Sequence, residues 1–180
     1  PGVARANRHK FDPIMQFRDR GFSYIANGHE VDKAEVIILG GTWNSFPESY
    51  KHDFITKMYY TANTFFDDID VNKLRPMKSL EEEMKINENT QCKIIGVTIE
   101  TRPDCIDKQE LRRFRQYGVT RVQIGIQHID DDILDRVDRR CSSKKTISAI
   151  KLLKIHAFKV DSHWMPDLPC PLKPEVSKFK

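Results

Sequence analysis

Residues 94–99 read IIGVTI, residues 122–126 read VQIGI and residues 159–165 read KVDSHWM. The first two stretches are short, apolar and rich in β-branched residues, a pattern typical of strands inside a sheet, and the third is expected to be the last strand, which Pro166 ends. One helical pattern separates the first two stretches, and two separate the second from the third. The order strand, helix, strand, helix, helix, strand predicts a parallel α/β sheet, open or barrel-like, because each crossover is long enough for a right-handed parallel connection.

The helices between these strands have recognisable starts and apolar faces. Asp107 predicts the N-cap of the helix that carries Leu111 and Phe114. Ile133 lies in the next helix, and Ser143 is expected to cap the last one. These helices supply the crossovers that a parallel sheet needs.

The upstream part begins with a further helix and strand. Asp12 followed by Pro13 predicts an N-cap and a first helical residue, and the helix is expected to stop before Gly28. Gly21 should weaken the middle of this helix. Val36–Leu39 is a continuous apolar run, which predicts a strand buried on both faces.

The stretch between the upstream and downstream parts is irregular. Pro47 is expected to open a second helix, after which residues 67–90 lose periodicity and are densely charged. We expect residues 67–90 to be a mobile insertion with a short helix near residues 80–84. The whole chain, residues 1–180, is expected to form one domain core.

Composition narrows the class of protein. The chain is 39% hydrophobic, has a formal net charge of +4 and lacks an apolar run near the ~18 residues that cross a bilayer, which predicts a soluble protein without a membrane partner. Its four cysteines have no CxxC or CxxxCxxC spacing, so no self-sufficient zinc or iron–sulfur site is expected. So few thiols argue against a disulfide framework and predict a reducing compartment, either the cytoplasm or another one. They are Cys92, Cys105, Cys141 and Cys170.

Polar or glycine-rich segments follow four of the predicted strands. Taken singly, Gly40-Gly41 can be a simple turn, Glu100 a salt-bridge partner of Arg102 or a helix cap, and His163 an ordinary half-buried histidine. Parallel strands bring their carboxyl ends to one rim, where ligands bind. Jointly, the segments predict an extended polar ligand with an amine, a ribose and a base. They are residues 40–42, 100–104, 125–127 and 163–167.

These segments carry a resemblance to a known family. GGT at 40–42, IETRPD at 99–104, TRVQIGIQ at 120–127 and HWMPDLP at 163–169 are collinear with the radical S-adenosylmethionine domain of the Elongator catalytic subunit. The resemblance runs from Arg5 to about residue 169. It implies a partial TIM-like barrel, here incomplete, and an enzyme family that modifies the wobble uridine of tRNA toward carboxymethyluridine.

The resemblance also implies roles for individual residues. Gly40, Gly41 and Thr42 would hold the amino group of S-adenosylmethionine, and Glu100 its ribose hydroxyls. Gln127 and Arg139 would meet the ribose and the methionine carboxylate, for which a guanidinium fork is suited. His163 would lie close to the adenosine. No catalytic residue is assigned.

Two expected parts of the family are missing from the sequence. The CxxxCxxC loop that holds a [4Fe–4S] cluster would precede Pro1, and the acetyltransferase domain that uses acetyl-CoA would follow Lys180. The chain alone therefore should perform neither radical chemistry nor acetyl transfer. Two hypotheses follow: an S-adenosylmethionine-binding core of an Elongator-type tRNA-modifying enzyme, or a degenerate, non-catalytic barrel that serves as an RNA-binding or assembly module.

Other positions depart from the family pattern. Arg140 and Cys141 replace a Gly-His pair, which puts a bulky cation beside the expected carboxylate site. Gln123 replaces a glutamate. Ala157 occupies a glycine position, and if that position needs a positive φ, alanine costs roughly 1 kcal/mol there.

Basic residues suggest a nucleic-acid partner. Arg112, Arg113 and Arg115 are expected on the solvated face of their helix. Two other clusters flank the predicted rim and fit tRNA binding by resemblance; further Elongator-type subunits are possible partners by the same resemblance. The RNA-binding candidates are Arg5, Arg8, Lys10, Arg140, Lys144 and Lys145.

Overall fold

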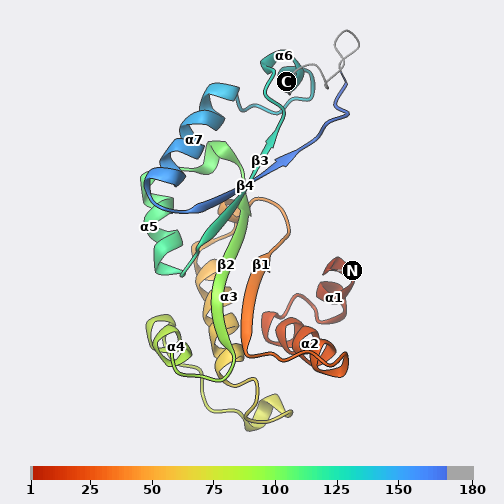
Figure 1. Cartoon of the computed structure of the whole chain (residues 1–180), viewed down its shortest axis with the longest axis vertical. Coiled ribbons are helices and arrows are strands. Elements are labelled where there is room, and N and C mark those ends of the chain that lie inside the picture. The colour runs from red at the N-terminus through yellow and green to blue at the C-terminus, as the bar shows by residue number, and fades with distance from the viewer. Residues whose placement is uncertain (1, 170–180) are drawn as a thin grey trace. The chain divides into compact units, whose positions relative to one another are not determined.

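The computed structural model of the chain describes residues 2–169 and divides them into two compact units (Figure 1). The first unit contains residues up to 39 and residues 46–97, and the second contains residues 40–45 and those from 98 onward. The strands form one sheet in the order β1-β2-β3-β4. Within the described range, no helix is long and apolar enough to cross a membrane.

The first unit is mostly helical. Its elements are α1 (Gly2–Arg8), α2 (Pro13–Ala26), β1 (Lys33–Ile38), α3 (Glu48–Asn63), a 3-10 turn (Val71–Lys73), α4 (Leu80–Asn87) and the first part of β2 (Lys93–Thr101).

Helix α2 begins where the sequence predicts, but its central glycine has a packing role that the sequence does not indicate. The Asp12 carboxylate accepts a hydrogen bond of 2.9 Å from the amide of Met15, which confirms the N-cap. A Cβ atom added to Gly21 would lie 2.4 Å from the ring of Phe65. Phe65 in turn packs against Phe22, with ring centroids 5.0 Å apart. Gly21 therefore permits a close approach between α2 and this aromatic core.

The prediction that residues 36–39 are buried on both faces is wrong. Burial alternates along β1, and the side chains of Ile37 and Leu39 are 51% and 66% exposed. Successive side chains of a strand point to opposite faces, and here one face packs while the other is open. On the packed face, Ala34 contacts the core beside Ile94 of β2.

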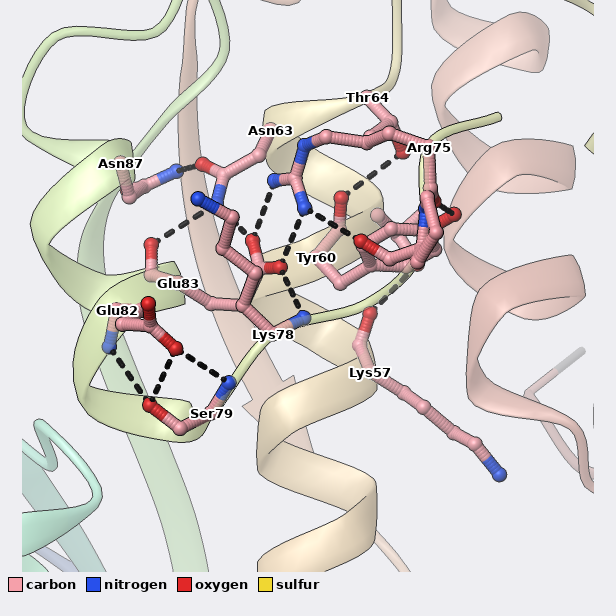
Figure 2. A network of polar contacts seen from close by, with 12 residues as sticks. Lys57, Tyr60, Asn63, Thr64, Arg75, Lys78, Ser79, Glu82, Glu83 and Asn87 are labelled. Carbon is pink, nitrogen blue, oxygen red and sulfur yellow. Dashed lines mark hydrogen bonds and ion pairs between the residues drawn. The ribbon is translucent and has the colours of Figure 1, made fainter. Parts of the chain in front are cut away.

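Helix α4 lies within the segment predicted to be mobile. A helix was expected near residues 80–84, and the observed α4 confirms it and extends it to Asn87. Ser79 and Glu82 form a reciprocal capping box at its start (Figure 2). The mobility of residues 67–90 stays a prediction.

A buried carboxylate joins α4 to α3 (Figure 2). Glu83 is fully buried, and its oxygens accept two hydrogen bonds of 2.7 Å from Arg75. The amide of Lys78 and the side chain of Asn63 donate further bonds of 2.9 and 2.7 Å. Burial works to raise the pKa of the Glu83 carboxyl, but these donors hold that pKa below its usual value.

The second unit has the predicted order of strands and helices. It contains a 3-10 turn (Trp43–Ser45), the end of β2, a second turn (Pro103–Cys105), α5 (Lys108–Gln116), β3 (Arg121–Gln127), α6 (Asp131–Arg136), α7 (Ser143–Ile155) and β4 (Lys159–Trp164). The pairs β2–β3 and β3–β4 are both parallel, which confirms the predicted α/β class.

Helix α7 begins one residue earlier than predicted. The Ser142 hydroxyl, not that of Ser143, accepts a hydrogen bond from the amide of Lys145. Ser143 instead binds Asp131, with its amide 2.7 Å and its hydroxyl 3.0 Å from the carboxylate. Neighbouring serines are both good caps, so the sequence pattern does not separate them.

Helices α5 and α7 each end in a hydrogen-bonded turn of the same type. After α7, the amide of Ala157 donates to Lys154 and that of Phe158 donates to Leu153, at 3.0 and 3.1 Å. Ala157 has a φ of 58°, so the positive φ considered for this family glycine position is confirmed. The corresponding residue after α5 is Gly118, with a φ of 70°. Both turns are Schellman motifs.

Candidate functional site

A pocket of about 220 Å³ lies where strands β2 and β3 of the second unit end. Three of the four strand-end segments predicted from the sequence contribute to it, and the loop after α6 adds an arginine. The lining residues are Gly41, Thr42, Glu100, Thr101, Arg102, Gly125, Gln127 and Arg139.

The glycine pair forms a turn that only glycine adopts readily. Gly40 and Gly41 have φ angles of 132° and 91°. Their Cα atoms face open space, with no atom within 4 Å of a built Cβ. Thr42 continues into a tight turn, because its carbonyl accepts from both the amide and the hydroxyl of Ser45, at 2.9 and 2.7 Å. The turn thus leaves space beside the backbone of Gly41.

Strand β4 brings the fourth predicted segment close to the carboxylate of Glu100. His163 pairs in register with Gly125 of β3, and its Nδ1 atom lies 3.3 Å from Oε1 of Glu100. Glu100 does not bind Arg102, as one reading of the sequence allowed. Arg102 instead makes two hydrogen bonds to Asp104, of 2.8 and 3.0 Å.

Arg139 is a half-buried cation with an incomplete set of partners. One terminal nitrogen donates to the carbonyl of Gly125 at 2.5 Å, while the buried Nε atom has no hydrogen-bond partner among the described residues. Burial lowers the pKa of Arg139, and the neighbouring charge of Arg102 lowers it further. No described carboxylate lies within salt-bridge distance of Arg139. A half-buried guanidinium with an unpaired buried nitrogen is therefore suited to pair with an anion.

Arg102 fixes the loop that carries Arg139. Besides binding Asp104, it donates a 3.0 Å hydrogen bond to the carbonyl of Arg139. Burial works to raise the pKa of the Asp104 carboxyl, but the hydrogen bonds from Arg102 keep that pKa below its usual value. The charge of Arg102 is therefore largely used within the fold, whereas that of Arg139 is available to a ligand.

Asn44 is a residue of this site that the sequence pattern does not reveal. Its side chain accepts from the hydroxyl of Thr101 and donates to Glu110 at 2.7 Å and to the carbonyl of Cys105 at 3.3 Å. Asn44 thereby ties the glycine turn to the end of β2. Its partners are more than fifty positions away in the chain, so no local pattern points to this residue.

Gly125 makes room for two of the predicted ligand-binding side chains. A Cβ atom at this position would lie 3.0 Å from Nε2 of Gln127 and 3.2 Å from a terminal nitrogen of Arg139. The pairing with β4 is irregular between Gly125 and Gln127, and Gln127 has a φ of 71°. A non-glycine residue in this conformation is strained, and such strain is typical of functional sites.

Arg140 does not line the pocket, although the sequence raised that concern. Its φ is 54°, and its guanidinium makes two hydrogen bonds to Asp138, of 2.8 and 2.9 Å. The side chain is 79% exposed. The neighbouring Cys141 is buried. The bulky cation thus turns toward solvent rather than toward Arg139.

None of the residues predicted to bind RNA lines this pocket. Arg5, Arg8 and Lys10 belong to the first unit, where Arg5 and Arg8 lie 3.8 and 3.9 Å from the carboxylate of Asp19. The other three, Arg140, Lys144 and Lys145, are exposed or half-buried in the second unit. Their role in RNA binding stays a prediction.

The described residues do not fit an iron–sulfur cluster. Across residues 2–169, no three His, Cys, Asp or Glu side chains gather closely enough to hold a metal ion. Cys92 is buried in the core of the first unit, and Cys105 and Cys141 belong to the second. Cys170 lies outside the described residues.

Comparison with known families places the chain in a recognised class. The sequence profile of the Radical SAM superfamily matches residues 24–166. The chain therefore belongs to the radical S-adenosylmethionine superfamily. This range contains the whole of the pocket.

Within that class, the chain is similar to Elongator proteins, as the resemblance predicted. It is 38% identical over 170 residues to Elongator complex protein 3 of Schizosaccharomyces pombe, covering 94% of this chain and 29% of that protein. It is 37% identical to the tRNA uridine(34) acetyltransferase of Dehalococcoides mccartyi, covering 94% of this chain and 35% of the relative.

A solved structure supports the same conclusion about the fold. The archaeal Methanocaldococcus infernus Elp3 with an N-terminal deletion matches with a TM-score of 0.83 and 36% identity, over 91% of this chain and 36% of that one. The predicted α/β fold with a partial barrel is confirmed. The chain spans between 29% and 36% of the length of these relatives.

Proposed function

We propose that the pocket binds S-adenosylmethionine and that the chain is the cofactor-binding core of an Elongator-type protein that modifies the wobble uridine of tRNA. The observation that carries the proposal is Arg139, a half-buried cation whose buried Nε lacks a partner among the described residues, in a pocket that also presents the Glu100 carboxylate. The superfamily and the names of the relatives support it.

The pocket offers a complementary group for each polar part of this ligand. The turn at Gly40, Gly41 and Thr42 faces open space that suits the amino group. Glu100 and Gln127 present acceptors for the ribose hydroxyls, and Arg139 presents a guanidinium for the carboxylate. In this proposal His163, 3.3 Å from Glu100, lies on the adenosine side.

The chemistry of the whole protein is a wider proposal. When bound, S-adenosylmethionine supplies a sulfonium whose S–C bond breaks on one-electron reduction. The described residues hold the ligand and orient it, but they do not provide the cluster ligands. We assign the cluster and acetyl-CoA to other segments of a longer protein, with tRNA and Elongator-type subunits as partners in a reducing, cytoplasmic compartment.

Calorimetry on the chain tests the cofactor proposal. The wild-type chain should bind S-adenosylmethionine, and Arg139→Gln should weaken that binding roughly tenfold to a hundredfold, because a charged hydrogen bond contributes about 1.5–3 kcal/mol. Arg136→Gln, at an exposed position of α6 outside the pocket, is the matched control and should leave the affinity unchanged.

A truncated ligand tests the assignment of each end. Methylthioadenosine keeps the ribose and adenine but lacks the carboxylate, so its affinity should respond to Glu100→Gln and not to Arg139→Gln. If the wild-type chain gives no heat with either ligand, the proposal is wrong. If Arg139→Gln weakens both ligands equally, the orientation is wrong.

A further inference from the structure

A second cavity lies in the same unit and shares no residue with the cofactor pocket. It has a volume of about 300 Å³ and is lined by residues of α5 and of the turn after α7. We call it the α5 groove. Its lining residues are Lys108, Leu111, Arg112, Arg115, His156 and Phe158.

The cations of the α5 groove form a row rather than a cage. Lys108, Arg112 and Arg115 are four and three positions apart, which places them on one face of α5. With a rise of about 1.5 Å per residue, the row is about 10 Å long. All three are exposed. The solvated face expected from the sequence is confirmed for Arg112 and Arg115, and both also line the groove.

The charges of this row are not neutralised within the fold. Arg113, on another side of the helix, forms an ion pair with Glu110. By contrast, no described carboxylate lies within salt-bridge distance of Lys108, Arg112 or Arg115. Three exposed cations so close together repel one another, and an anionic ligand would relieve that repulsion.

The floor of the groove is apolar and one of its cations is held in place. Leu111 and Phe158 form the floor and are almost fully buried. The guanidinium of Arg115 lies 4.0 Å from the centroid of the Phe158 ring and donates to the carbonyl of His156. Arg115 is thus preorganised, while Lys108 and Arg112 remain free to contact a ligand.

We propose that the α5 groove binds the phosphodiester backbone of an RNA strand, with one phosphate at each of Lys108 and Arg112 and the sugar against Leu111. A linear row of cations suits a chain of regularly spaced anions better than a single small anion, which convergent donors would surround. The inference rests on the proposed function, because it takes the substrate to be an RNA. It adds a contact site away from the cofactor pocket.

Salt-dependent RNA binding tests the groove. Binding of labelled tRNA to the 180-residue chain is measured by anisotropy over about 50–200 mM salt. The variant Lys108→Gln/Arg112→Gln should bind about tenfold more weakly and lose about 0.7 per phosphate contact from the slope of log affinity against log salt. The control Lys151→Gln/Lys154→Gln removes two exposed charges from α7 outside the groove and should keep the wild-type slope.

The outcomes separate this inference from the proposed function. Both variants should bind S-adenosylmethionine like the wild type, which also shows that they fold. If the groove variant keeps the wild-type RNA affinity and slope, or the two variants lose affinity equally, the groove is not an RNA site. If the wild-type chain binds the cofactor but no tRNA, the RNA part of the proposed function fails as well. Polyglutamate serves as a probe for an acidic protein. If it binds the wild-type chain but not the groove variant, and the two chains bind RNA equally, the groove is a site for an acidic protein and not for RNA.

Discussion

Buried charged side chains differ in how completely the fold satisfies them. Arg18 is buried in the first unit and donates to the carbonyls of Thr64 and Ile69, and Glu83 accepts from several donors. Arg139 keeps a buried nitrogen with no partner in the described part of the chain. The first two are satisfied by groups of the fold, whereas Arg139 keeps a donor that a ligand can use.

The Glu83 network predicts a specific acid sensitivity. Because the folded-state pKa of Glu83 is below its usual value of 4.5, its ionised form stabilises the fold above that pH. This contribution should be lost as the pH falls through the lowered pKa. Urea unfolding between about pH 7 and pH 3 should therefore show a component that Glu83→Gln removes.

The same substitution should lower stability at neutral pH. Removing one partner of a buried ion pair costs about 3–5 kcal/mol, and the lower end applies because Arg75 retains access to water. Glu81→Gln, at an exposed position in the same turn of α4, is the control and should change little. Equal stability of wild type and Glu83→Gln at pH 7 would contradict this account.

Gly21→Ala should destabilise the first unit despite alanine's higher helix propensity. Alanine gains about 1 kcal/mol in a helix, but its Cβ would meet the Phe65 ring at 2.4 Å, and overpacking costs about 1–3 kcal/mol. A net loss in urea unfolding is expected. Ser23→Ala, exposed on the same helix, should not show it. A stabilised Gly21→Ala variant would mean that the ring moves aside at no cost.

Residues that act through distant partners were the hardest to predict from the sequence. The N-cap role of Asp12 was predicted because its partner lies three positions away. For Gly21 the sequence predicts only a weaker helix. Its contact with Phe65 is not predicted, because Phe65 is far away in the sequence. Asn44 was missed for the same reason. The strand-end residues of the pocket were predicted because a topological rule, not a local pattern, brings them together.

At the scale of elements, helix ends were predicted well and strand faces less well. A continuous apolar run at residues 36–39 correctly indicated a strand, but it does not say which faces other elements cover. Helix ends depend on a few adjacent residues, as the N-cap at Asp12 shows, whereas Ala157 was indicated by the glycine position that it occupies in the family pattern. Gly118 and Ala157 both have a positive φ. They occupy equivalent positions in two Schellman motifs.

These two motifs allow a matched pair of substitutions. Ala157→Gly should stabilise the chain by about 0.5–1 kcal/mol, because it relieves a left-handed alanine at some cost in unfolded-state entropy. Gly118→Ala should destabilise it by about 1 kcal/mol for the opposite reason. Thermal unfolding of both variants checks the pair. Shifts of the same sign would show that backbone strain does not control these turns.

At the scale of the whole molecule, apolar surface gathers on the open face of the first unit's strands. Ile37 of β1, Ile95 of β2 and Leu39, directly after β1, are each more than half exposed. Clusters of exposed apolar side chains favour association or a covering segment. Charged residues elsewhere on the surface do not cover these exposed apolar side chains.

Substitutions on this face should alter surface behaviour without altering stability. Ile37→Thr/Ile95→Thr should reduce the binding of a hydrophobic dye and change the free energy of unfolding by less than about 0.5 kcal/mol each. Ile94→Thr, one position away and packed against the core, should instead destabilise the chain. A large loss of stability in the double variant would show that the face is packed in solution.

The left-handed backbone at Gln127 has a consequence for protein engineering. A screen for thermostability would favour glycine or asparagine at this position, since either adopts a φ of 71° more readily than glutamine. Glycine would remove the amide that lines the pocket, and asparagine would shorten its reach by one methylene group. Gln127 therefore belongs among the positions that a stabilised variant of this chain should keep fixed, together with the glycine that gives it space.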